Sequence, residues 1–302
     1  MTEILARALG ASRRYGDVVA LDNVDLDVPA GSMIGLLGPN GAGKSTLLNL
    51  LVGLRRPTSG SVELFGGPPL DASRRQGLGM TPQQTGLPPT LRVNEVVDFV
   101  AAHYPDPMPV DEVLAQFGLS DKARKQTGAL SGGQQRRRLA VALAFVGRPR
   151  LVVLDEPTTG LDVGARRTLW DAIRTFHADG GTVLLTSHYL EEIEALAERV
   201  VVLGGGKVLA DGSVAEIRGQ LARSTVSFRA DSPDISKLNA LPGAVAYRRD
   251  GERHVLQAAD AYELVRQLVI SGMEFHDLEV RAASLEEAFL ALTTTEKTGA
   301  TR

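Results

Sequence analysis

The spacing of apolar residues predicts β structure and one buried strand in the first part of the chain. Across residues 4–67, short alternating runs surround one continuous apolar run, Met33–Leu37, which leads into a glycine-rich turn and a helical run over residues 44–54. Alternation is typical of strands with one face in water, and a continuous run is typical of a strand buried on both faces. This region is therefore expected to combine an antiparallel β part with a buried strand.

The next two stretches have different periodicities. Residues 90–146 follow a helical pattern, interrupted where Pro105, Pro107 and Pro109 force a loop. Residues 150–211 alternate strands with helices. The strands are expected at residues 151–154, 182–186 and 200–203, and the first of them is apolar throughout. Alternation of this kind predicts a parallel sheet with crossover helices, and the helical stretch is predicted to be an insertion into it.

The remainder of the chain reads as a separate small α+β module. We expect strand, helix, strand, strand, helix, strand and helix over residues 225–229, 232–240, 244–248, 254–258, 261–271, 274–281 and 284–293. The predicted organisation is a main α/β domain over residues 1–220, with its helical part at about 90–146. A small domain over residues 221–293 and a flexible polar tail over residues 294–302 follow it.

Composition excludes several classes of function. The 302 residues are 43% apolar, enough for two cores, and 33 Lys and Arg against 36 Asp and Glu give a net charge of −3. This balance gives no support for wholesale nucleic-acid binding. The absence of cysteine excludes a disulfide framework, a thiolate metal site and a cysteine nucleophile, and it fits a reducing compartment. No apolar run approaches the roughly 20 residues of a membrane span, and the N-terminus lacks a secretory pattern, so the cytosol is expected.

A phosphate-binding loop follows the buried strand at residues 33–37. The segment fits the pattern G-x-x-x-x-G-K-[ST] and opens a helix. This position makes the match more specific than a chance glycine-rich turn. Its residues are Gly38, Pro39, Asn40, Gly41, Ala42, Gly43, Lys44, Ser45 and Thr46. In such a loop, backbone N–H groups and a helix N-terminus surround phosphate, Lys44 reaches the terminal phosphates, and the Ser45 hydroxyl binds Mg²⁺.

Two adjacent carboxylates end the apolar strand at residues 151–154. Asp155 and Glu156 would emerge at the C-terminal edge of the parallel sheet, where ligands bind in such folds. Asp155 is predicted to hold Mg²⁺ through water, and Glu156 to orient or deprotonate an attacking water. The alternative is that both carboxylates only stabilise the N-terminus of the helix after Pro157.

A second anion-binding turn is predicted before the helix that starts near Gln134. Ser131, Gly132 and Gly133 offer backbone N–H groups and a hydroxyl at a helix N-terminus, enough to bind a γ-phosphate, although such a sequence also occurs as a plain turn. The chain order is phosphate loop, Leu-Ser-Gly-Gly-Gln and then Leu-Asp-Glu-Pro. In this order the sequence closely resembles, over residues 3–215, the nucleotide-binding subunits of ATP-binding cassette (ABC) transporters. The resemblance implies a P-loop NTPase fold of the α/β class, with a parallel core sheet, an antiparallel β subdomain and a helical subdomain.

The resemblance also implies roles for four further residues. Tyr15 matches the aromatic residue that stacks on adenine, and Gln83 matches the glutamine that contacts Mg²⁺ and senses the membrane partner. Asp162 matches the loop that crosses to the partner subunit, and His188 matches the histidine that contacts the γ-phosphate. With Lys44 and Glu156, Gln83 and His188 complete the expected catalytic set, and the expected ligands of Mg²⁺ are Ser45, Gln83 and Asp155.

The chain departs from the family pattern just after the second turn. Between Gln134 and Asp155 it has one residue more than the usual spacing, which we expect the first turn of the helix to absorb as a bulge. The same turn carries Arg136, Arg137 and Arg138. These arginines are expected to form a solvated helix face, with a nucleic-acid patch as the alternative.

In the family that the sequence resembles, the signature turn of one subunit closes over ATP held by the other. This implies a homodimer, or a pairing with a similar subunit, that binds two ATP molecules and works on an integral membrane permease from the inner face of the cell membrane. The last helix resembles the ending of ATPase subunits of ABC-2 type exporters of drugs, antibiotics or lipids. Its apolar spacing, from Leu285 to Leu292, also fits a helix packed on its own domain, and import stays open.

A second class of function is a soluble ABC ATPase that acts on ribosomes or nucleic acid without transport. Relatives of that kind usually join two cassettes in one chain or carry a long coiled-coil insertion, and this sequence has neither.

Overall fold

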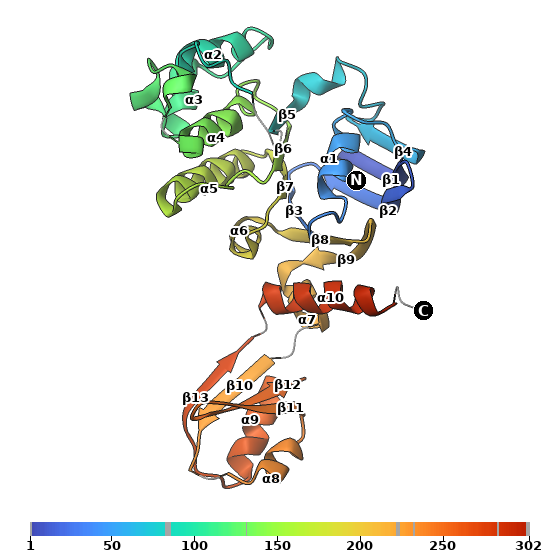
Figure 1. The fold of residues 1–302 in the computed structure, drawn as a ribbon, viewed down its shortest axis with the longest axis vertical. Helices are drawn as coiled ribbons and strands as arrows, with labels where there is room; N and C mark the ends of the chain where they lie inside the picture. Colours follow the sequence, from blue (N-terminus) through green and yellow to red (C-terminus); the bar gives the residue numbers. More distant parts are fainter. Residues whose placement is uncertain are drawn as a thin grey trace. The chain divides into compact units, whose positions relative to one another are not determined.

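The computed structural model describes residues 2–81, 86–130, 132–221, 224–231, 233–282 and 284–299. The chain forms two compact units, Met1–Val214 and Ala215–Arg302 (Figure 1). The division lies in helix α7 (Val214–Leu221), slightly before the boundary expected at residue 220. Within the described ranges, no helix is both long enough and apolar enough to cross a bilayer.

The first unit is built on a six-stranded sheet. Its order is β5-β6-β7-β3-β8-β9, and all neighbours are parallel except β8 and β9. The strands are β5 (Leu78–Thr81), β6 (Leu151–Asp155), β7 (Thr182–Thr186), β3 (Met33–Leu37), β8 (Arg199–Gly204) and β9 (Lys207–Ser213). Every residue of β3, β6 and β7 is buried, as their continuous apolar runs predict, and the predicted parallel sheet is confirmed.

A three-stranded antiparallel sheet lies beside it, in the order β2-β1-β4. Its strands are β1 (Ile4–Tyr15), β2 (Val18–Pro29) and β4 (Ser59–Leu64). Strand β2 continues through Asn23, which takes a φ of 54°, because the pairing with β1 shifts register there instead of ending. Helix α1 (Lys44–Leu51) contacts both sheets, so that their apolar faces share one core. It ends before residue 54 because Gly53 takes a φ of 77°, as glycines after helix ends commonly do.

The helical insertion and the crossover helices complete this unit. They are α2 (Val93–Ala101), α3 (Val110–Gln116), α4 (Gly132–Leu143), α5 (Val163–Ala178) and α6 (Leu190–Leu196), with 3₁₀ turns at Arg74–Gly77, Ser120–Lys122 and Thr127–Ala129. Helix α4 packs on β5 and α5, α5 packs on β7, and α6 packs on β3. The helical insertion predicted within residues 90–146 is confirmed.

The second unit has the predicted elements in the predicted order. After α7 come β10 (Ser224–Arg229), α8 (Ile235–Asn239), β11 (Ala244–Asp250), β12 (Arg253–Ala258), α9 (Ala261–Ile270), β13 (His276–Arg281) and α10 (Leu285–Gly299). The antiparallel sheet order β11-β12-β10-β13 gives a ferredoxin-like βαββαβ arrangement. One core joins Val226, Phe228 and Leu256 of the sheet to residues of α8 and α9. Helix α10 continues to Gly299, past the end expected at residue 293.

The aromatic contacts of Phe145 predict a test of the packing in the first unit. Phe145 is fully buried, with its ring centroid 5.0 Å from that of Phe117 and 5.2 Å from that of Phe176. We expect Phe145→Ala to lower the free energy of unfolding of this unit by about 3–5 kcal/mol, because it removes a buried ring and leaves a cavity. Urea unfolding followed by circular dichroism measures it. Phe99→Ala, at a ring that is 64% exposed, is the matched control and should change the value by less than about 0.5 kcal/mol; equal effects of the two would contradict the packing described.

Candidate active site

The phosphate loop joins β3 to α1 and depends on glycine at defined positions. Gly43 takes a φ of 101°, and a Cβ there would lie 2.4 Å from the carbonyl oxygen of Ala20. A Cβ on Gly38 would lie 2.5 Å from the carbonyl oxygen of Leu203. Real side chains do not tolerate such distances, so the loop can curl over the end of β3 only with glycine at these positions.

A cavity of about 510 Å³ opens above this loop and brings distant predicted residues together. The loop contributes most of its lining, Glu156 and His188 follow β6 and β7, and Tyr15 ends β1. The residues that line the cavity are Tyr15, Ala20, Asn40, Gly41, Ala42, Gly43, Lys44, Ser45, Thr46, Glu156 and His188. Ala20 is the one lining residue that the sequence analysis did not single out for the site.

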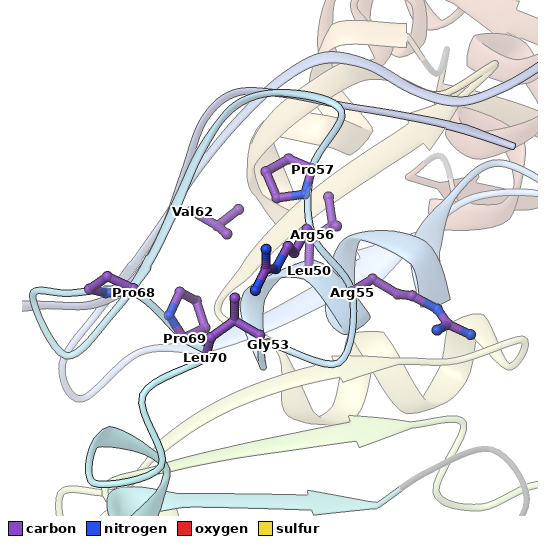
Figure 2. Close-up of a pocket in the computed structure, with 9 residues that line it drawn as sticks. All are labelled: Leu50, Gly53, Arg55, Arg56, Pro57, Val62, Pro68, Pro69 and Leu70. Atoms are coloured by element: carbon purple, nitrogen blue, oxygen red, sulfur yellow. The ribbon is translucent and has the colours of Figure 1, made fainter.

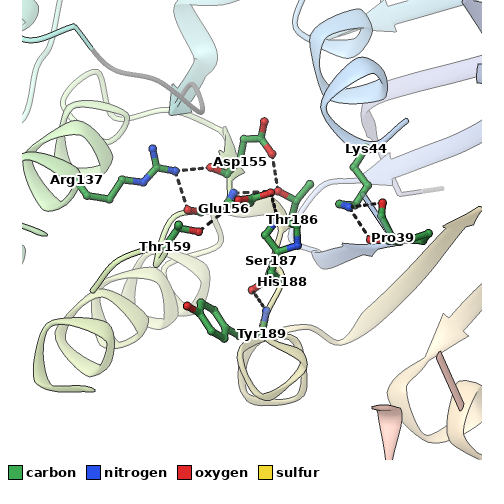
Figure 3. A network of polar contacts seen from close by, with 11 residues as sticks. Pro39, Lys44, Arg137, Asp155, Glu156, Thr159, Thr186, Ser187, His188 and Tyr189 are labelled. Carbon is green, nitrogen blue, oxygen red and sulfur yellow. Dashed lines mark hydrogen bonds and ion pairs between the residues drawn. The ribbon is translucent and has the colours of Figure 1, made fainter. Parts of the chain in front are cut away.

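Lys44 is buried and held by its own loop. Its Nζ donates to the carbonyl oxygens of Gly38 at 2.6 Å and Pro39 at 3.0 Å (Figure 3). An ammonium group has three donors, so these two bonds orient it without using its full capacity. Burial lowers the pKa of Lys44, and the nearby carboxylates of Glu156 and Asp155 oppose that effect. Lys44 therefore keeps an N–H donor at the cavity, where a phosphate would lie.

Thr186 links the two carboxylates at the end of β6. Its hydroxyl donates to Asp155 Oδ1 at 2.7 Å and accepts the backbone N–H of Glu156 at 2.9 Å. Asp155 is almost fully buried, and its side chain is thereby fixed in one orientation. From the sequence, Thr186 was expected only as the last residue of the strand at residues 182–186.

Glu156 is held against His188 in an unusual backbone conformation. His188 Nε2 lies 2.5 Å from Glu156 Oε1, within hydrogen-bond distance (Figure 3). Glu156 takes a φ of 52°, in the left-handed region that few residues other than glycine adopt. Such strain persists only where surrounding contacts enforce it, and it clusters at functional sites. The carboxylate and the imidazole that the sequence analysis assigned to catalysis are thus neighbours.

The expectation for the three arginines is wrong at two of them. Arg137 donates to the carbonyl oxygens of Asp155, of Glu156 at 2.7 Å and of Pro157 at 3.3 Å, as Figure 3 shows for the first two. Arg138 donates to the carbonyl oxygens of Phe117 at 2.7 Å and Gly118 at 2.8 Å. These guanidinium groups form neither a solvated face nor a nucleic-acid patch, because backbone carbonyl oxygens occupy them. The strand and helix ends that carry those oxygens lie far away in sequence.

Helix α4 starts at Gly132, earlier than expected, and the predicted bulge is absent from it. Gly132–Leu143 is α-helix at every residue, and a Cβ on Gly133 would meet no atom within 4 Å. The first four N–H groups of a helix lack an intrahelical acceptor; in α4 they belong to Gly132, Gly133, Gln134 and Gln135. The predicted anion-binding turn therefore coincides with a helix N-terminus, and Ser131 lies outside the described residues.

The other predicted residues take these places. Tyr15 is partly exposed at the cavity, and the guanidinium of Arg13 lies 4.7 Å from its ring centroid. Asp162 begins α5, where its side chain accepts the N–H of Ala165 at 2.8 Å. Gln83 lies outside the described residues.

Oxygen ligands for a hard cation are available beside the phosphate loop. Among the described residues, no group of three or more His, Cys, Asp or Glu side chains is arranged to hold a metal ion. The Asp155 carboxylate and the Ser45 hydroxyl are the oxygen donors that Mg²⁺ prefers, and Mg²⁺ usually takes further ligands from water and substrate phosphates. The residues present therefore fit an ion that arrives with a nucleotide.

A second cavity, of about 440 Å³, contains none of the predicted site residues. It lies where α1 ends and β4 begins (Figure 2). Its lining residues are Leu50, Gly53, Arg55, Arg56, Pro57, Val62, Pro68, Pro69 and Leu70.

Comparison with known proteins gives close relatives along most of the chain. Residues 21–159 match the family model described as ABC transporter. A daunorubicin resistance ATP-binding protein of Streptomyces coeruleorubidus is 37% identical, over 94% of this chain and 94% of its own length. A Nod factor export ATP-binding protein of Cupriavidus pinatubonensis is also 37% identical, over 93% of this chain and 88% of its own length.

Solved structures resemble the larger part of the chain. The ATP-binding subunit of an ABC transporter matches with a TM-score of 0.66 and 28% identity, over 72% of this chain and 92% of that chain. A dimeric ATP-binding cassette in a post-hydrolysis state, bound to ADP and Pi, matches with a TM-score of 0.63 and 27% identity, over 69% of this chain and 98% of that chain. The chain therefore belongs to the ATP-binding subunits of ABC transporters, among the ABC-2 type exporter ATPases.

Proposed function

We propose that this ATPase subunit hydrolyses ATP in the cavity above the phosphate loop and thereby drives a separate membrane permease that exports drugs, antibiotics or lipids. The observation that carries the catalytic part is the 2.5 Å contact between Glu156 and His188, in the same cavity as Lys44. A carboxylate, an imidazole and an ammonium group converge there on the place where a terminal phosphate would lie.

In this proposal, ATP is bound by the phosphate loop, Lys44 and Tyr15. The N–H groups of residues 41–46 and the N-terminus of α1 would surround the phosphates, Lys44 would bind their oxygens, and Tyr15 would stack on adenine. Ser45, Gln83 and Asp155, the last through water, would hold Mg²⁺. When bound, this ion would neutralise part of the charge on the phosphate oxygens.

Glu156 is the proposed general base. It would accept a proton from the water whose oxygen attacks the γ-phosphorus, while the bond from that phosphorus to the β–γ bridging oxygen breaks and ADP leaves. His188 would contact the γ-phosphate and, through its bond to Glu156, orient the carboxylate. Thr186 and Arg137 support this role because they hold the backbone of Glu156 from two sides.

The second half of each site would come from a partner subunit. Ser131, Gly132, Gly133 and Gln134, at the N-terminus of α4, would bind the γ-phosphate of ATP held by the partner, and the loop of Asp162 would lie at the same interface. A dimeric cassette among the similar solved structures supports this arrangement. We propose a homodimer or a pairing with a similar ATPase subunit.

The names of the relatives support export. One is named for daunorubicin resistance and another for Nod factor export. We therefore propose export of a drug, antibiotic or lipid, and a position on the inner face of the cell membrane, bound to the permease. A role on ribosomes or nucleic acid has less support, because Arg137 and Arg138 donate to backbone carbonyls.

Lys44→Ala tests nucleotide binding. We expect the change to weaken ATP binding by about 2–5 kcal/mol, which at 1.4 kcal/mol per tenfold is about 30-fold or more, because it removes the buried charge that faces the phosphates. Isothermal titration with ATP and Mg²⁺ measures the affinity. Lys207→Ala, at an exposed lysine paired with Asp22, is the control and should bind like the unmodified protein. Unchanged affinity in Lys44→Ala would remove this lysine from the binding site.

Glu156→Gln tests the chemistry separately from binding. The amide keeps the shape of the side chain but is no base, so the turnover rate should fall by about 10²- to 10⁴-fold. ATP affinity should stay within a few-fold, and an ATP-bound dimer should accumulate. Phosphate release and size-exclusion chromatography with ATP measure these quantities. Glu198→Gln, whose carboxylate pairs with His177, is the control; hydrolysis by Glu156→Gln at the unmodified rate would exclude the base role.

Affinity purification from membranes tests the partner. With ATP present, the tagged full-length chain should retain an integral membrane protein with several transmembrane helices. Mass spectrometry of the eluate identifies the partner. Recovery of ribosomes in place of such a protein would overturn the transport proposal and support the soluble alternative.

A further inference from the structure

A buried carboxylate, Glu192 on α6, lies behind the catalytic residues and joins three segments. Its Oε2 accepts the hydroxyl of Thr158 at 2.9 Å, and its Oε1 accepts the indole N–H of Trp170 at 2.9 Å. The side chain of Ser187 also lies beside it and helps to lower its pKa. Glu192 itself is 0% exposed, so protein groups surround its charge on every side.

Two of these three partners are directly connected to the catalytic pair. Thr158 is two residues after Glu156, and Ser187 immediately precedes His188. The oxygen of Ser187 accepts the N–H of Tyr189 at 2.9 Å, which closes a turn with His188 at its centre. Figure 3 shows Ser187, His188 and Tyr189 following one another beside Glu156. One carboxylate thus binds the segment that carries Glu156 and lies beside the segment that carries His188.

Burial of the Glu192 carboxylate costs free energy unless hydrogen bonds replace those it would make with water. Burial raises the pKa of Glu192, whereas the hydrogen bonds from Ser187, Trp170 and Thr158 and the charge of Arg166 lower it. A leucine would fill much of the same space without that desolvation cost. The indole N–H of Trp170 can only donate, so an apolar replacement would leave a buried donor without an acceptor. The three donors fit a carboxylate and not an apolar side chain.

We propose that Glu192 is a positioning residue for ATP hydrolysis, which holds the Thr158 and Ser187 segments so that Glu156 and His188 stay in contact. This inference rests on the roles proposed for Glu156 and His188. Lys44 and the phosphate loop belong to other elements, and Lys44 bonds to its own loop. Loss of Glu192 should therefore affect the chemical step more than the binding of ATP.

Trp170 supplies a spectroscopic reporter of the same contact. It is the only tryptophan of the chain, and its indole N–H donates to Glu192 Oε1. An indole that loses its hydrogen-bond acceptor emits at shorter wavelength. The fluorescence of the full-length protein therefore reports whether the contact at Glu192 is intact.

The experiment compares Glu192→Leu with Glu192→Gln in the full-length protein. The leucine variant should lower kcat for ATP hydrolysis by about 10- to 100-fold, the size expected when reacting groups are slightly misplaced. It should leave the ATP dissociation constant within about twofold, and its tryptophan emission should shift to shorter wavelength. The glutamine variant should keep kcat within about threefold, because its oxygen can accept from Trp170 while its amide donates to a hydroxyl, which both donates and accepts.

Glu191→Gln is the matched control, since that neighbouring carboxylate is 79% exposed and pairs with Arg166 at 3.9 Å; it should leave kcat and emission unchanged. If Glu192→Leu does not fold, Ser187→Ala takes its place, because it deletes one oxygen between Glu192 and the His188 turn. Its kcat should fall by about tenfold or more at unchanged ATP affinity.

Three results would overturn the proposal. They are a folded Glu192→Leu with kcat within twofold of the unmodified protein, equal losses of kcat and ATP affinity in that variant, and equal losses in the leucine and glutamine variants. A failure of the proposed catalytic role of Glu156 is distinguishable from these results, because Glu156→Gln would then hydrolyse ATP at the unmodified rate.

Discussion

The register of three buried parallel strands determines where every group of the site lies. Thr186 at the end of β7 pairs with Asp155 of β6 on one side and with Leu36 of β3 on the other. The three strands therefore end level with one another, and the segments that follow them emerge at one edge of the sheet. Those segments are the phosphate loop, Glu156 and His188. Parallel strands place ligands at this edge in open α/β sheets generally, and the apolar runs of β3, β6 and β7 fix the pairing because neither face tolerates water. A single shifted strand would separate the base from the phosphate loop.

The backbone at Glu156, just after β6, is held by side-chain hydrogen bonds in addition to the pairing of the sheet. Glu156 leaves the strand with a φ of 52°, a conformation that costs free energy for a residue with a side chain. Thr186 binds its N–H, and Arg137 binds its carbonyl oxygen and those of its two neighbours. Arg137 belongs to α4, the same helix whose first residue is Gly132. One regular helix thus connects the turn that we propose faces a partner's nucleotide to the strand end that carries Glu156.

The sequence predicted the sheet and the loop because their signals are local. Continuous apolar runs identified β3, β6 and β7, and the glycine positions of the phosphate loop follow from close approaches to Ala20 and Leu203 that only glycine allows. Arg137, Arg138 and Glu192 gave no such signal, since their partners lie at least 18 residues away along the chain. An arginine that binds a distant carbonyl and an arginine in water have the same local sequence. The regular start of α4 was missed for a different reason: glycine usually weakens a helix, but at the first positions it costs little and exposes N–H groups.

Binding and hydrolysis rest on separate networks within one cavity. Lys44 is oriented by carbonyl oxygens of its own loop, between β3 and α1. Glu156 is bound by Thr186 of β7 and Arg137 of α4. Behind Glu156 and His188, Glu192 of α6 binds Trp170 of α5 and Thr158. Among the described residues, no hydrogen bond joins Lys44 to Glu156; their coupling is the attraction between their charges. A nucleotide can therefore bind to the first network whether or not the second is in its catalytic geometry. That separation is what an ATPase requires if binding of ATP is to drive one conformational step and its hydrolysis another.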